Sequence, residues 1–251
     1  MNVLPPVPSG APRRFAPRPV GLDQFPSLLR ETAALIGAAP VRLCGLFLLV
    51  FLPIQLLPNL PYVAMPLRAT LASVGFAGFF AALESVRQRR AATIMDMAQP
   101  WRLPADKLVL LVASGLLPLL AVLLVWWVDL GGSELDAFLG GRAADETLAM
   151  RQQIEFVVIF NLVGMPLLFI QPLSVLFTWS ASRTLSANLL AWVANWRWAL
   201  VLTLVSIPVA IGLDSFDPAS APELVLSLLS EIAVEIGLCA FTLILLQRSL
   251  Q

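Results

Sequence analysis

Two glutamates, Glu231 and Glu235, interrupt the last long apolar segment of the chain. Their spacing of four places both carboxyl groups on one face of a helix. Counted inward from the start of the segment, Glu235 lies roughly 18 Å along the helix axis, near the middle of a bilayer. Counted from the other end, Glu231 approaches the outer boundary and only Glu235 stays embedded. At least one of the two carboxyl groups therefore needs a partner or a proton. The same stripe continues through Ser227, Cys239 and Thr242.

Two interpretations of these carboxyl groups stay open. The first is a path for ions, protons or a substrate through a helix bundle. The second is a structural carboxyl group bonded to a neighbouring helix, or a helix that enters the bilayer late and leaves Glu231 in water. Arg68, at the start of an earlier apolar run, is a candidate partner for Glu231. Three further polar residues inside apolar runs are candidates either for interhelical hydrogen bonds or for substrate contact: Gln55, Asn161 and Gln171.

Three arginines, Arg87, Arg89 and Arg90, directly follow the second apolar run. Basic side chains at this position bind anionic lipid headgroups, each contributing on the order of 1 kcal/mol. They also determine which side of the membrane a loop occupies. The two roles are compatible, so we expect these arginines to contact anionic lipids at the cytoplasmic face.

Most catalytic chemistry lacks its usual residues in this chain. There is no histidine, and we find no P-loop, glycine-rich dinucleotide turn, nucleophile–base pair or metal-ligand cluster. Cys44 and Cys239 lie in apolar runs and are interpreted as free thiols. The formal net charge is zero, which gives no field that would attract nucleic acid. We therefore expect no enzyme, no cofactor, no bound metal and no nucleic-acid partner.

The elements that position these residues are six long apolar runs. The chain is 59% hydrophobic and only 13% charged, and no single soluble core of 251 residues would absorb that apolar surface. Each run is near the length of about 20 residues that spans a bilayer. The pattern predicts an all-α polytopic bundle of six transmembrane helices, at about 43–60, 66–86, 108–130, 154–179, 198–213 and 224–246. In the second run, Gly75 and Gly78 with Ala81 and Ala82 are predicted to form a small-residue packing face within the bundle.

The charges between the runs predict an orientation. Thirteen of the sixteen basic residues fall in the N-terminal region, in two alternate gaps and at the C-terminus, while Arg68, Arg142 and Arg151 fall in the opposite gaps. The positive-inside rule then places both termini in the cytoplasm, which requires an even number of spans. Abundant Arg, Ala, Leu and Pro are typical of a bacterial protein, so we expect a bacterial inner membrane.

Two segments precede the runs. Residues 1–20 carry six prolines and no apolar stretch, and are predicted to be a disordered cytoplasmic arm. Residues 21–39 have a helical period, with Leu22, Phe25 and Leu29 on one apolar stripe, and are predicted to be an amphipathic helix at the membrane surface.

Between the fourth and fifth runs, residues 180–197 are predicted to form a polar cytoplasmic helix.

Three stretches resemble a known group, the six-span bacterial inner-membrane proteins related to YciC. They are Phe25 to Pro40 before the first run, Arg87 to Trp101 after the second, and Ser186-Ala187-Asn188 with Asn195-Trp196 after the fourth. The resemblance extends from about Gly21 onward, although this chain has fewer cytoplasmic polar residues than the group. It implies a helical inner-membrane bundle, and no activity or site residues come with it.

Two classes of function are compatible with these features. The first is a non-catalytic inner-membrane component that maintains the envelope, or a scaffold that binds lipids or partner proteins. The second is a small solute or proton-coupled transporter or channel that uses Glu235 and Glu231, with Arg68, Asn161 and Gln55 as further pathway candidates. The small number of embedded polar residues favours the first class, because a hydrophilic path usually needs more of them.

Overall fold

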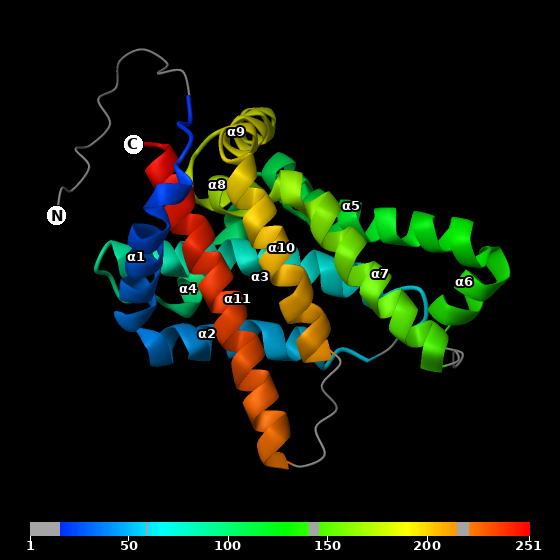
Figure 1. Cartoon of the computed structure of the whole chain (residues 1–251). Helices are drawn as coiled ribbons and strands as arrows, with labels where there is room; N and C mark the ends of the chain where they lie inside the picture. Colours follow the sequence, from blue (N-terminus) through cyan, green and yellow to red (C-terminus); the bar gives the residue numbers. More distant parts are fainter. Residues whose placement is uncertain (1–15, 59, 141–145, 215–220) are drawn as a thin grey trace.

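The computed structural model describes residues 16–58, 60–140, 146–214 and 221–251, and every regular element in these ranges is a helix (Figure 1). The predicted all-α class is confirmed. The six apolar runs coincide with the long helices, of which the fourth is interrupted. Their bounds are α2 Pro40–Gln55, α3 Ala64–Arg87, α5 Ala105–Leu130, α7 Glu146–Gly164 followed by η3 Met165–Leu167 and α8 Ile170–Leu176, α10 Trp196–Asp214, and α11 Ala221–Ser249.

The chain is a multi-pass membrane protein. Four described helical stretches are long and apolar enough to cross a bilayer: 64–87, 105–130, 154–176 and 226–249. The number rises to six if each of two bent helix pairs forms one span. The short helices lie between or before these elements: η1 Leu22–Gln24, α1 Phe25–Gly37, α4 Ile94–Met97, η2 Gln99–Arg102, α6 Gly132–Leu139 and α9 Ala181–Ala194.

Helix α3 lies at the centre of the bundle, where it packs against α2, α5, α8 and α11 (Figure 1). Its second half is buried almost without interruption because small residues let neighbouring backbones approach. A Cβ atom on Gly78 would lie 2.3 Å from the carbonyl oxygen of Met97, and one on Gly115 of α5 would lie 2.5 Å from that of Ala69. A Cβ atom on Gly75 would instead lie 3.2 Å from Val50 of α2, so the small-residue face of α3 contacts both α4 and α2.

The fourth span is broken between α7 and α8, around Pro166. A proline has no N–H and cannot continue the hydrogen-bond ladder, so the break leaves backbone groups without helical partners. The fully buried side chain of Asn188 in α9 forms hydrogen bonds with two of these backbone groups. Its Oδ1 accepts from the N–H of Phe169 (3.0 Å), and its Nδ2 donates to the carbonyl of Pro166 (2.7 Å).

Adjacent opposite charges on α5, Asp106 and Lys107, hold the turn between α8 and α9. Lys107 Nζ donates to the carbonyls of Ser174 (2.8 Å) and Phe177 at the C-terminal end of α8. Asp106 Oδ2 accepts from the N–H of Ala181 (3.0 Å) at the start of α9. Each charge has the sign that the helix dipole favours at that end. Lys107, the single lysine of the chain, is thus buried.

The two ends of the described chain lie side by side. The N–H of Arg18 donates to the carbonyl of Ser249 (2.7 Å), and the N–H of Val20 donates to Asn195 Oδ1 (3.0 Å). The indole of Trp198, which is buried, donates to the carbonyl of Val20 (2.9 Å). Two residues of the predicted disordered arm, Arg18 and Val20, are therefore hydrogen-bonded to the bundle, and residues 1–15 lie outside the described residues.

Helix α1 turns by 80° into α2. Leu28, Thr32 and Leu35 are buried, and α1 packs mainly on α11. The predicted stripe of Leu22, Phe25 and Leu29 is more than 40% exposed. Helix α1 therefore carries apolar residues on two sides: one side packs on protein, and the other is the stripe predicted to face the membrane surface.

Candidate functional site

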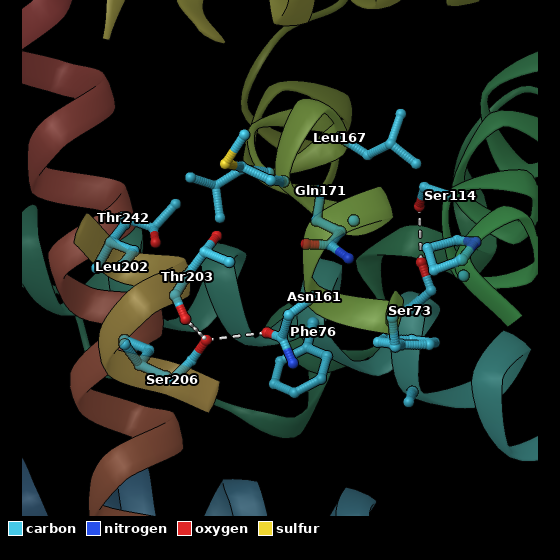
Figure 2. A pocket seen from close by; sticks show the side chains of 18 of the residues that line it. Ser73, Phe76, Ser114, Asn161, Leu167, Gln171, Leu202, Thr203, Ser206 and Thr242 are labelled. Atoms are coloured by element: carbon cyan, nitrogen blue, oxygen red, sulfur yellow. Dashed lines mark hydrogen bonds between the residues drawn. The ribbon is translucent and has the colours of Figure 1, made fainter. Parts of the chain in front are cut away.

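A cavity of about 280 Å³ lies between α3, α5, α7, α8, α10 and α11 (Figure 2). Its apolar wall includes Phe76, Phe160 and Leu202. Its polar wall consists only of hydroxyl and amide side chains: Ser73, Ser114, Asn161, Gln171, Thr203, Ser206 and Thr242. The cavity is therefore amphipathic and collects polar groups from segments that are far apart in the chain.

Prolines occur in the helices that form one side of the cavity. The ring of Pro118 in α5 lines it, the break around Pro166 adjoins it, and Pro208 lies in α10. A proline inside a helix removes one hydrogen bond and bends the helix away from its ring. Gly164, at the end of α7, lies against Pro118 and leaves space where a larger side chain would extend.

Several polar groups of the cavity satisfy one another. Ser73 and Ser114 share a hydrogen bond of 2.9 Å, and the hydroxyl of Ser73 also lies 2.7 Å from the carbonyl of Leu111. Ser206 donates to Asn161 Oδ1 (2.9 Å), whose Nδ2 donates to the carbonyl of Val157 in the same helix (2.8 Å). These pairs tie α3 to α5 and α7 to α10 around the cavity (Figure 2).

Three polar groups of the lining stay unpaired. Within the described part of the chain, the side-chain amide of Gln171 and the hydroxyls of Thr203 and Thr242 make no hydrogen bond to protein. Gln171 reaches from α8 into the cavity, between the Ser73–Ser114 pair and the Asn161–Ser206 pair (Figure 2). None of the three groups is enclosed by protein, so each faces the space of the cavity, where a ligand or water can form hydrogen bonds with it.

The residues that line the cavity carry no charge. A desolvated ion would need a compensating charge or a full set of coordinating dipoles, and no lining side chain supplies a charge. Among the described residues, no group of three or more His, Cys, Asp or Glu side chains could hold a metal ion. The geometry fits a neutral molecule that can both donate and accept hydrogen bonds.

The five predicted pathway residues do not form one site. Asn161 lines the cavity, and so does Gln171, the other amide inside an apolar run. Gln55 is exposed at the end of α2, and Arg68 donates to the carbonyl of Leu57. Glu235 is half-buried on α11, roughly 10 Å along the axis from Thr242, two turns away. Glu231 lies one turn further out and is exposed.

The predicted lipid-binding arginines differ from one another. Arg87 donates twice to the buried carboxylate of Glu84, at 2.6 and 2.8 Å. Glu84 also accepts from Gln88 and from Gln247 of α11, so it joins α3 to α11. The side chains of Arg89 and Arg90 are exposed. Arg87 therefore has a structural role through its pairing with Glu84. The sequence pattern did not distinguish Arg87 from Arg89 and Arg90.

The sequence pattern missed Ser73, Ser114, Thr203 and Ser206 as site residues. Hydroxyls are common in membrane helices, where they bond to the carbonyl one turn back, so none of the four stands out alone. Thr242 was identified only as part of the glutamate stripe. What distinguishes these residues is that they converge on one cavity.

The chain matches no protein-family model, and no curated protein or solved structure is similar to it at a significant level. The resemblance to the YciC-related proteins therefore stays a prediction. The function has to be argued from the fold and from the geometry of the cavity.

Proposed function

We propose that this protein is a non-catalytic membrane protein that binds a small uncharged molecule in its central cavity. The observation that carries the proposal is the set of unpaired groups, Gln171, Thr203 and Thr242, in a lining without charge. A ligand with an amide or hydroxyl group would satisfy them, and its apolar part would pack on Phe76 and Phe160.

The size of the cavity supports a small ligand. The cavity has a volume of about 280 Å³. A short-chain amide or alcohol fits this volume, whereas most drug-sized ligands need pockets of about 300–1,000 Å³. We place the protein in a bacterial inner membrane on the basis of its composition, and both termini in the cytoplasm on the basis of its charge distribution.

Transport of the same molecule is the second candidate. The break between α7 and α8 adjoins the cavity, and discontinuous helices form the substrate sites of many transporters. Asn188 already satisfies the backbone groups at Pro166 and Phe169, which supports a fixed break more than a gate. For this reason we rank binding without transport first.

Thermal unfolding of the purified protein tests the binding proposal. The probes are butyramide, which is neutral, and butyrate and butylammonium, which have a similar shape and carry a charge. We expect butyramide alone to raise the unfolding temperature, by an amount that grows with its concentration. The double variant Gln171→Leu/Thr203→Val should lose this response, while Ser186→Ala, on the exposed side of α9, should keep it.

Two results would contradict the proposal. One is an equal response to butyrate and butyramide, and the other is a wild-type response that survives in the double variant. Uptake of butyramide into proteoliposomes, compared with protein-free liposomes, separates transport from binding alone.

A further inference from the structure

Helix α9 lies across one end of the bundle and does not continue the span that comes after it. It meets α10 at 84° (Figure 1). One side of α9 is buried against the bundle, through Thr184, Ala187, Asn188 and Ala191. The polar residues on this side are therefore the ones that face protein, which is the reverse of a solvated cytoplasmic helix.

The opposite side of α9 and its connection to α10 is apolar and exposed. Four apolar residues follow one another here at spacings of four, four and three: Leu185, Leu189, Val193 and Trp196. Each is 38–60% exposed. The hydroxyl of Ser186 on the same side donates to the carbonyl of Ser182 (2.9 Å), so it does not require water. We call the four apolar residues the outer face of α9.

Arginines stand at both ends of this outer face. The guanidinium of Arg183 lies 5.0 Å from the ring centre of Trp179, and that of Arg197 lies 5.7 Å from that of Trp196. Both arginines are exposed. Tryptophan and arginine together are typical of the headgroup level of a bilayer, and a guanidinium binds phosphate with paired hydrogen bonds.

We propose that α9 is a membrane-interface helix whose outer face inserts into the headgroup region of one leaflet, where Arg183 and Arg197 bind lipid phosphates. The right-angle turn into a spanning helix carries the outer face to the bilayer surface, and the arginines match the charge of anionic lipids. The N-terminal segment reaches the same end of the bundle, since the N–H of Val20 donates to Asn195 between α9 and α10. The inference does not depend on the cavity.

Site-specific quenching tests the position of the outer face. In a variant with both native cysteines removed (Cys44→Ser, Cys239→Ala), an environment-sensitive fluorophore is attached at Val193→Cys, and at Gln251→Cys as an exposed control. The proteins are reconstituted in liposomes that contain lipids with a spin label near the headgroup. We expect lipid quenching at 193 to exceed that at 251 several-fold, and quenching by aqueous iodide to show the opposite order.

Two outcomes would overturn the proposal. Iodide quenching at 193 equal to that at 251 means that the outer face is in water. Protection of 193 from both iodide and spin-labelled lipid means that a second copy or another protein covers it.

The arginines are tested with the same fluorophore at 193 by comparing spin-labelled phosphatidylglycerol with spin-labelled phosphatidylcholine. We expect the anionic lipid to quench more strongly, with a preference of about fivefold for each arginine in contact. Arg183→Gln/Arg197→Gln should remove the preference and leave the depth unchanged. Arg151→Gln should alter neither, because Arg151 lies in one of the opposite gaps and pairs with Asp129 and Glu155. Equal quenching by the two lipids in the parent protein would overturn the role of the arginines.

Discussion

At the scale of single residues, two kinds of polar side chain inside the bundle have different roles. Side chains of the first kind form hydrogen bonds that join elements distant in the sequence: Asn188, Asn195, Lys107 and Glu84. Gln171 belongs to the second kind, because its amide faces the cavity without a protein partner. Groups of the first kind stabilise the bundle, whereas groups of the second kind are available to a ligand.

Asn188→Leu should destabilise the protein strongly. The change leaves the N–H of Phe169 and the carbonyl of Pro166 unsatisfied in a buried place, which costs about 1–3 kcal/mol for each group. The measurement is the unfolding midpoint of the detergent-solubilised protein in a denaturant titration. Ser186→Ala, an exposed position on the same helix, should change the stability by about 0.5 kcal/mol or less. Equal effects of the two changes would contradict the role of Asn188.

Glu235→Gln should leave the response to butyramide unchanged. Glu235 does not line the cavity and stands roughly 10 Å along α11 from Thr242. The unfolding temperature with and without butyramide measures this, and Gln171→Leu serves as the variant expected to lose the response. Solute or proton flux in proteoliposomes that disappears with Glu235→Gln would instead support the proton-coupled transporter.

At the scale of elements, close approach of helix backbones decides how α3 packs. Gly78 touches the carbonyl of Met97 in α4, and Gly115 of α5 touches that of Ala69 in α3. The helix pairs are held by dispersion contacts over these small residues, since lipid provides little hydrophobic drive between helices. The contacts depend on shape, so they are sensitive to a single methyl group.

Gly78→Ala should lower the stability by about 1–3 kcal/mol, because its Cβ would lie 2.3 Å from the Met97 carbonyl oxygen and the backbones would have to separate. Gly45→Ala is the matched control: no atom lies within 4 Å of its Cβ, and alanine favours a helix by up to about 1 kcal/mol. Denaturant titrations of both variants provide the comparison. A neutral Gly78→Ala would show that α4 does not pack on α3 this closely.

At the scale of the whole molecule, the start and the end of the described chain meet at one end of the bundle. Asn195 links them, since it accepts from Val20 and donates to Ser249 (3.0 Å). Trp198 reinforces the contact through the carbonyl of Val20 and by stacking on Phe25 at 5.8 Å. An even number of membrane crossings agrees with this closure.

Reporter fusions test the orientation of the whole chain. A fluorescent protein fused to the C-terminus should be fluorescent, and alkaline phosphatase fused there should be inactive, because the positive-inside rule places this end in the cytoplasm. Alkaline phosphatase fused after Leu139, at the end of α6, should be active. An active phosphatase at the C-terminus would contradict the orientation.

The sequence alone identifies part of the site, because some of its residues are conspicuous within their own segment. Asn161 and Gln171 stand out because an amide inside an apolar run is costly wherever it lies. The hydroxyls of Ser73 and Thr203 do not stand out, because each can bond to its own helix. Glu231 and Glu235 drew attention by charge, yet neither lines the cavity. Charge along a sequence reports the cost of burial and carries no information about which helix face turns inward.

The six apolar runs determined, by themselves, that this is a helical membrane protein, and the spacing of the two glutamates within the last run determined only that both lie on one helix face. Hydropathy and backbone hydrogen bonding are properties of one segment at a time, and in lipid an apolar run of this length has to become a helix. Only the tertiary structure decided that Gln171, Thr203 and Thr242 share a cavity and that α9 turns its apolar side outward. These facts depend on contacts between segments tens of residues apart, and a one-dimensional pattern does not contain those contacts.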